Sequence, residues 1–276
     1  MNKKLSVIHN LYKRNEYVNQ SVKLNIMALK AAKIDFQYIL FNDNGDKDIW
    51  EDVKEFSDAE YIYSDINYGY KMCSGGWIGA IPYLKGEYIH NVGQDDVMTF
   101  NFYKDSVDIL DKNSDIHLVF SNGFQADEQL NAIDLMLNPN FILNQNQAYH
   151  NPIECFKFWF GINSVFYETG SDVVTCTNNN IPAPGTIYRK KLHDLIGEPD
   201  VDTFRGACDF EYWARVLFNE YKCHLIEIPN WLYRKSEYSA GEEIIEGKHN
   251  LNHWNNIFLE KIKEKYTELW EEKCKS

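Results

Sequence analysis

The chain has 276 residues, of which 44% are hydrophobic and 15% aromatic, so it can bury one sizeable core without disulfide support. Asp and Glu outnumber Lys and Arg by 41 to 28. The resulting net charge of −13 argues against nucleic acid as the main partner, because phosphate backbones are bound by clustered cations. A phosphate-bearing ligand would need a local cation, which a divalent metal ion can supply.

Cysteines and apolar stretches bear on the cellular location. The six cysteines form no Cys-x-x-Cys pair, a pattern typical of reduced thiols inside a cell. Met1-Asn-Lys-Lys4 runs directly into a strand-like stretch, without the apolar core of a secretion signal. No apolar stretch is long enough to span a bilayer. We therefore expect a cytoplasmic protein, and we leave open peripheral contact with a membrane and formation of a homodimer.

The first third of the chain alternates strand and helix patterns. Leu5–His9 predicts a strand, and apolar residues at helical spacing predict a helix from Val18 to Leu29 behind a cap at Asn15. Three more apolar stretches, each followed by a polar turn, predict strands at Phe36–Phe41, Tyr61–Tyr63 and Glu87–His90. This order is typical of an α/β domain with a mainly parallel, Rossmann-like sheet, helices on both faces and ligands beyond the carboxyl ends of the strands. No dinucleotide-binding glycine motif or P-loop is present.

The second half is less regular. A strand at Ile116–Phe120 is followed by an aromatic-rich passage at Phe156–Tyr167, a loop at Ile181–Gly185 and a helix at Asp209–Asn219. From Leu251 to Trp270 apolar residues recur at helical spacing with Glu and Lys between them, which predicts a C-terminal helix packed on the domain. A helix on a membrane surface is the alternative, although a more basic polar face would suit it better.

Three acidic positions could carry chemistry, and each also has an ordinary structural interpretation. Asp95 and Asp96 follow a predicted strand and would bring hard oxygen ligands for Mg²⁺ or Mn²⁺ to the cleft, but a solvated turn would look the same. Asp43, at the end of the second strand, could accept hydrogen bonds from a base or a ribose, and it also fits a common turn. Asp209 could be a general base or a helix cap.

Six segments occur in an order that resembles family 2 glycosyltransferases, which have the GT-A fold. They are Ser6-Val-Ile-His-Asn10, Phe41-Asn-Asp43, Asn67-x-Gly69, Lys85-Gly-Glu-Tyr-Ile89 followed by Asp95-Asp96, Gly185-Thr-Ile-Tyr-Arg189 and Asp209-x-Glu211-x-Trp213-x-Arg215. The resemblance covers Leu5 to Tyr238. It implies a single GT-A domain over residues 1–240, with a nucleotide-sugar-binding half at 1–120 and an acceptor-binding half at 121–240, and a helical extension at 241–276.

The resemblance also implies roles for individual residues. Asp209 would be the catalytic base, and Asp95 would bind Mn²⁺ or Mg²⁺ as the last acid of the DxD motif. The residues expected to contact the donor are Asn10 and Asp43, at the base and ribose, together with Asn67, Lys71, Asp96 and Arg234. The implied enzyme moves a sugar, with inversion, from a nucleoside-diphosphate sugar to a hydroxyl of a glycan or glycolipid, as in surface polysaccharide synthesis. UDP is the favoured nucleotide.

Three positions depart from the family pattern and keep two other functions open. Gly93 stands where the first DxD acid is expected, Cys208 replaces an acid beside the base, and Ser236 stands where a His is common. A nucleotidyltransferase would use a related architecture, but His9–Arg14 lacks the glycines of its triphosphate loop. A non-catalytic protein that binds nucleotide sugars or glycans on the same fold is the third interpretation.

Overall fold

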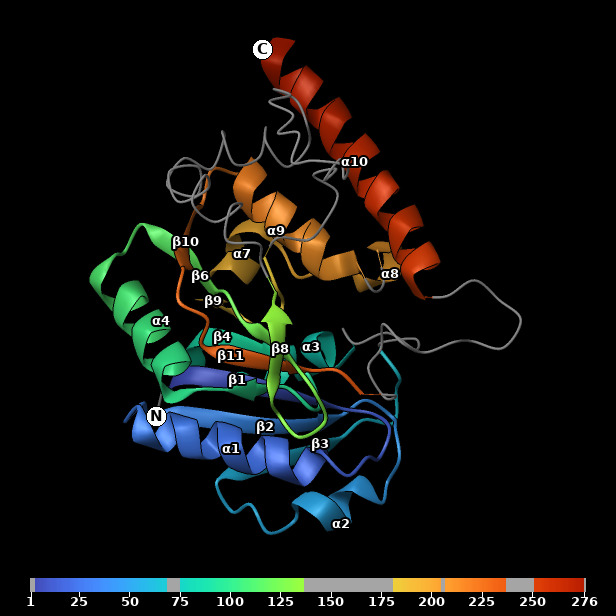
Figure 1. Cartoon of the computed structure of the whole chain (residues 1–276). Coiled ribbons are helices and arrows are strands. Elements are labelled where there is room, and N and C mark those ends of the chain that lie inside the picture. Colours follow the sequence, from blue (N-terminus) through green and yellow to red (C-terminus); the bar gives the residue numbers. More distant parts are fainter. Residues whose placement is uncertain (1–2, 69–74, 137–180, 205–206, 237–250, 276) are drawn as a thin grey trace.

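The computed structural model describes residues 3–68, 75–136, 181–204, 207–236 and 251–275 (Figure 1). Two features of the sequence interpretation lie outside these ranges: Lys71, expected at the donor, and the aromatic passage at 156–167. The described residues form an α/β fold with two sheets, and the larger sheet lies at its centre.

The central sheet has seven strands among the described residues, and all neighbouring strands run parallel except at β9. β9 pairs antiparallel with both β4 and β6. In spatial order the strands are β10 (Lys222–Ile226), β6 (Ile116–Ser121), β9 (Thr186–Arg189), β4 (Gly86–Val92), β1 (Lys3–Leu11), β2 (Phe36–Asn42) and β3 (Ala59–Tyr63). The prediction of a mainly parallel sheet is therefore confirmed, and each predicted strand of the first half is present.

Helices cover both faces of this sheet, because its strands are apolar on both sides. Leu5 and Val7 of β1 contribute to one core cluster and Ile8 to the other. The Leu5 side is covered by α1 (Val18–Ala31) and α4 (Phe100–Lys112), and the Ile8 side by α3 (Gly75–Ala80), α9 (Cys208–Phe218) and α10 (Leu251–Lys275) (Figure 1). The remaining short helices are α2 (Ile49–Val53), η1 (Ile81–Tyr83), α7 (Leu192–Ile196) and α8 (Val201–Phe204).

A second sheet of four short strands was not foreseen from the sequence. Its order is β5 (Val97–Met98), β11 (Trp231–Arg234), β7 (Phe124–Ala126) and β8 (Ala132–Leu135). β5 pairs with β11 through Met98 and Trp231. The sheet therefore places the chain immediately after Asp96 beside the strand that ends at Arg234.

Two local predictions can be compared with the helix termini. α1 begins at Val18 with Tyr17 at the cap position and no side-chain cap, so the predicted cap at Asn15 was wrong. Asn15 instead accepts a hydrogen bond from Tyr17 N (3.0 Å), which closes the turn before the helix. The predicted C-terminal helix is confirmed as α10, whose Ile262 and Tyr266 are buried against the domain. None of the helices in the described ranges is long and apolar enough to cross a membrane.

Candidate active site

Polar side chains gather at the carboxyl ends of β1 and β2. Asn10 donates through Nδ2 to Asn91 Oδ1 (2.8 Å) and Val92 O (2.7 Å), which ties the end of β1 to β4. Its Oδ1 is buried and has no hydrogen-bond partner among the described residues. A Cβ at Gly76 of α3 would lie 2.2 Å from this oxygen, so only glycine fits there. The end of β1 thus presents a buried acceptor that suits an N–H group of a ligand.

Asp43 follows β2 and is held from the neighbouring loop. It is buried, and its Oδ1 accepts a hydrogen bond from Tyr68 N (2.9 Å). Asn67, next to Tyr68, contacts Tyr12 Oη at 3.5 Å. The structure therefore brings the predicted donor residues Asn10, Asp43 and Asn67 to the ends of adjacent strands, as expected for a parallel sheet.

The acidic loop Gly93–Asp96 follows β4, which lies next to β1 in the sheet. It connects to the group just described, because Gln94 Oε1 accepts from Tyr12 N (2.8 Å). Asp95 is partly exposed, and its Oδ2 accepts from Ser236 Oγ at 3.4 Å. Asp96 is only 1% exposed, the backbone N–H groups of Gly93 and Arg234 lie near enough to stabilise its negative charge, and its buried Oδ1 has no hydrogen-bond partner among the described residues.

Burial and mutual repulsion shape the electrostatics of the two acids. Burial raises the pKa of Asp95, partly offset by hydrogen bonding and by the Arg234 guanidinium. The pKa of Asp96 is raised well above its usual value by burial and then by the negative charge of Asp95. Two adjacent carboxylates that resist ionisation together create a local demand for positive charge.

Arg234 lies beside these acids, but its guanidinium is fully buried. Its Nε donates to Asp95 O (3.3 Å), Nη2 to Gln20 Oε1 (2.8 Å) and Nη1 to Glu128 O. The guanidinium also lies over the Tyr17 ring, 4.4 Å from its centroid. The predicted contact between Arg234 and a donor diphosphate would require these bonds to be exchanged.

Asp209 lies in the first turn of α9, with Ala207 at the cap position. The cap interpretation of Asp209 is therefore wrong: its Oδ1 accepts from its neighbour Phe210 N (2.8 Å), and the side chain is partly exposed. Cys208, which replaces the usual acidic neighbour, is fully buried and faces the core.

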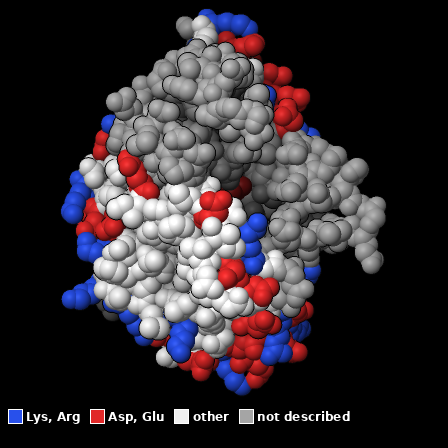
Figure 2. All heavy atoms as spheres, viewed as in Figure 1, with Lys and Arg blue, Asp and Glu red and all other residues white. Residues whose placement is uncertain are grey.

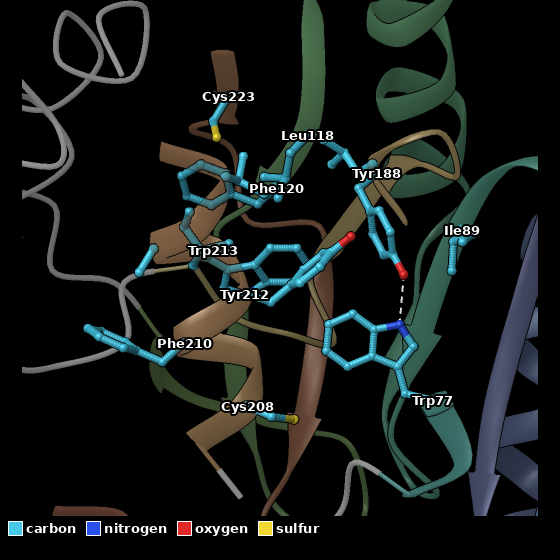
Figure 3. Close-up of a cluster of buried hydrophobic side chains, with 14 of the residues drawn as sticks. Trp77, Ile89, Leu118, Phe120, Tyr188, Cys208, Phe210, Tyr212, Trp213 and Cys223 are labelled. Atoms are coloured by element: carbon cyan, nitrogen blue, oxygen red, sulfur yellow. Dashed lines mark hydrogen bonds between the residues drawn. The ribbon is translucent and has the colours of Figure 1, made fainter. Parts of the chain in front are cut away.

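An aromatic cluster fixes α9 against the sheet (Figure 3). Trp77 of α3 lies 5.6 Å from both Tyr212 and Trp213 of α9, measured between ring centroids, and Trp77 Nε1 donates to Tyr188 Oη of β9 (2.7 Å). Trp77 directly follows Gly76, which packs against Asn10. One short helix therefore connects the carboxyl end of β1 to the helix that carries Asp209.

A family model described as Glycosyl transferase family 2 matches residues 6–170, more than half of the chain. The chain belongs to glycosyltransferase family 2. The match includes the residues at the ends of β1 and β2 and the acidic loop, whereas α9 lies beyond it. The comparison with curated proteins gives no match.

Solved structures of glycosyltransferases share the GT-A fold with this family 2 chain. S. aureus TarS 1–349 in complex with UDP-GlcNAc is 14% identical, with a TM-score of 0.56 over 94% of this chain and 65% of that one. The mannosyltransferase PcManGT from Pyrobaculum calidifontis, in complex with GDP-Man and Mn²⁺, is 10% identical, with a TM-score of 0.56 over 88% of this chain and 59% of that one. This chain thus spans less than two thirds of either of those chains.

The acidic loop of this glycosyltransferase fits a divalent cation. No group of three or more His, Cys, Asp or Glu that could hold a metal occurs among the described residues, so protein carboxylates alone would not enclose the ion. Mg²⁺ and similar ions are often bound by one or two carboxylates plus phosphate oxygens of the substrate. Asp95, partly exposed and next to a second acid, suits that kind of site.

The sequence interpretation missed the buried residues that hold the acidic loop. His9 has Nε2 at 2.9 Å from Gln94 O and Nδ1 at 2.7 Å from Tyr38 Oη. Ser21 and Asn25 of α1 both donate to Asp96 O, at 2.8 and 3.0 Å. A polar residue at the end of an otherwise apolar strand was the only available signal for His9.

Proposed function

We propose that this glycosyltransferase transfers a sugar, with inversion, from a nucleoside-diphosphate sugar to a hydroxyl of a glycan or glycolipid, in surface polysaccharide or glycan synthesis. The observation that carries the proposal is the chain of contacts from Asn10 through Gly76 and Trp77 to α9. Through these contacts the protein holds the Asn10 amide, proposed to meet the donor, and the Asp209 carboxylate in fixed relative positions. The family assignment supports transfer of a glycosyl group. A UDP-sugar is the favoured donor, in keeping with the UDP-GlcNAc complex of TarS.

Each residue has a task in the proposed reaction. Asn10 would offer its buried, unpaired Oδ1 to an N–H of the base, and Asp43, with Asn67 beside it, would contact the ribose. Asp95 would hold Mn²⁺ or Mg²⁺, which neutralises the charge that develops on the departing diphosphate. Lys71, outside the described ranges, stays a predicted donor contact.

Asp209 acts on the acceptor. Its carboxylate takes the proton of the acceptor hydroxyl while that oxygen forms a bond to the anomeric carbon. The bond from the anomeric carbon to the diphosphate oxygen breaks, and its electron pair leaves with the nucleoside diphosphate. Attack opposite to the leaving group inverts the configuration. A side chain in the first turn of a helix and partly exposed can reach a ligand in this way.

The surface charge explains why a cation is expected at the donor phosphates. On the face seen in Figure 2, acidic side chains collect over α2 with Lys and Arg between them, and the two groups pair, as in Arg14 with Asp52 and Lys54 with Glu51. The chain as a whole carries −13. A diphosphate would be repelled at long range, so a bound divalent ion would supply the missing local attraction.

The cytoplasmic location, a contact with the membrane and the formation of a homodimer stay predictions.

The test separates chemistry from donor binding. Asp209→Asn keeps the size of the side chain but removes the base, so turnover of a nucleotide sugar should fall by roughly 10²- to 10⁴-fold. Calorimetric binding of UDP with Mn²⁺ should stay near the wild-type value and be lost in EDTA. Asp202→Asn, at an exposed acid in the nearby α8, is the matched control and should keep full turnover. Wild-type turnover in Asp209→Asn would remove the assignment of the base.

A further inference from the structure

Three successive carbonyl groups of the acidic loop are held from inside the protein. Gln94 O contacts His9 Nε2 (2.9 Å), Asp95 O accepts from Arg234 Nε (3.3 Å), and Asp96 O accepts from Ser21 Oγ (2.8 Å) and Asn25 Nδ2 (3.0 Å). All four of these side chains are 0% exposed. They come from β1, α1 and β11, so three separate elements converge on one short loop.

The hydrogen bonds of His9 define its proton positions. Gln94 O can only accept, so Nε2 carries the proton, and Nδ1 accepts from Tyr38 Oη. Asn25 contributes twice, because its Oδ1 also accepts from Met98 N (2.7 Å) just beyond the loop. Loss of the His9 or the Arg234 donor would remove the side-chain partner of Gln94 O or Asp95 O, whereas Asp96 O keeps one donor when either Ser21 or Asn25 is replaced.

The Asp96 side chain faces the same interior. The backbone N–H groups of Gly93, at one end of the loop, and of Arg234 in β11 stabilise its negative charge. A Cβ at position 93 would lie 2.5 Å from Asp96 Oδ2, so the Asp96 carboxylate occupies space that a side chain at 93 would need. Position 93, where the first acid of the DxD motif is expected, therefore lacks an acid, and the Asp96 carboxylate fills part of the space that the side chain of such an acid would need.

We propose that His9, Ser21, Asn25 and Arg234, together with the Asp96 carboxylate, are positioning residues that hold the loop in its metal-binding conformation before the donor arrives. Asp95 is then the single loop carboxylate that meets the ion. This inference rests on the proposed function, and it gives Asp96 and Arg234 a different role from the predicted donor contacts. Their burial favours this role, because Arg234 cannot reach a ligand without breaking its present bonds and the Asp96 side chain is only 1% exposed.

Two variants and one control test the proposal in the full-length protein. Ser21→Ala removes one donor to Asp96 O with little change in volume, and His9→Phe removes the donor to Gln94 O while it keeps an aromatic ring. Ser106→Ala is the control, because the buried Ser106 Oγ of α4 has no partner among the described residues. If His9→Phe fails to fold, Ser21→Ala alone decides.

The first measurement is hydrogen exchange of the amides from residue 93 to 98, which needs neither metal nor donor. Both variants should speed exchange there at least tenfold over wild type, while Ser106→Ala leaves these amides unchanged. The second is the Mn²⁺ affinity in the presence of UDP. Loss of groups that orient a metal ligand costs 10- to 100-fold in affinity, whereas Ser106→Ala should keep the wild-type Mn²⁺ affinity.

The outcomes distinguish the two proposals. Faster loop exchange with weaker Mn²⁺ affinity supports the positioning role. Unchanged loop exchange, or faster exchange with wild-type Mn²⁺ affinity, overturns it. If wild-type protein binds neither Mn²⁺ nor UDP, the proposed function fails, and loop exchange alone then decides whether these residues hold the loop.

Discussion

The most direct test of the altered acidic loop is to add one methyl group at Gly93. Gly93 does not have a positive φ; among the described glycines, Gly197 does. Backbone strain therefore does not exclude Ala at position 93. The difficulty is contact: the new Cβ would lie 2.5 Å from Asp96 Oδ2. Asp96 has little room to move away, because its side chain is only 1% exposed and is enclosed by the protein.

The magnitude follows from what must give way. Forced overpacking of a closely packed interior costs about 1–3 kcal/mol. We therefore expect Gly93→Ala to lower the free energy of unfolding by roughly 1–3 kcal/mol. At about 2–4 °C per kcal/mol for a chain of this size, Tm should fall by roughly 2–12 °C.

A double-mutant cycle makes this prediction specific. Asp96→Ala removes the obstructing carboxylate, so Gly93→Ala should cost far less in that background, and the two losses of stability should not add. Urea unfolding of the four proteins measures the coupling. Strict additivity, or a Gly93→Ala protein as stable as wild type, would refute the claim that the Asp96 carboxylate has taken the space of residue 93.

Two further predictions concern stability away from the loop. Tyr266→Phe should lower the free energy of unfolding by about 1.5–3 kcal/mol in urea titrations, because Tyr266 Oη of α10 donates to Oε1 of the fully buried Glu211 (3.0 Å). Tyr83→Phe is the control, because Tyr83 is 47% exposed. An equal loss of stability in both variants would contradict the role of the Tyr266 hydroxyl. Burial lowers the pKa of His90 from 6.5 to about 4. Between these two pH values the unfolded chain binds more protons than the folded one. The stability that the neutral His90 contributes is therefore complete above pH 6.5, and about 3 kcal/mol of it is lost as the pH falls to 4. Urea titrations from pH 7 to 4 should show a shallower loss in His90→Phe, and identical slopes would contradict it.

The fold of the first half could be predicted because its signals are local. Apolar strands such as Leu5–His9 end in polar turns, and in a parallel sheet these ends must meet at one edge. The second sheet could not be predicted in the same way. β5 has two residues, and it pairs with β11 more than 130 positions later, so no local pattern announces it.

Part of the candidate site could likewise be predicted from local signals and part could not. Asp95 and Asp209 were predicted from short motifs, but the environment of each depends on distant partners. Glu211 illustrates this: it lies within the motif of Asp209, yet its carboxylate bonds to Arg215 (2.8 Å) on the same helix and to Lys265 (3.0 Å) on α10. The sequence predicted that α10 packs on the domain. That Glu211 is the acid contacted by Lys265 and Tyr266 of α10 was known only from the structure.

The loss of an acid at position 93 explains why the acidic loop should need such a firm internal framework. Where two loop carboxylates grip one ion, the ion itself can order the loop, because both ligands gain from converging on it. If Asp95 is the one loop carboxylate at the ion, as we propose, the ion contributes little to the shape of the loop, so the placement of that carboxylate must come from the protein. The buried bonds to Gln94 O, Asp95 O and Asp96 O supply this placement before any ligand binds. A single ligand also leaves most of the coordination to donor oxygens, so metal and nucleotide should each strengthen the binding of the other by the same factor.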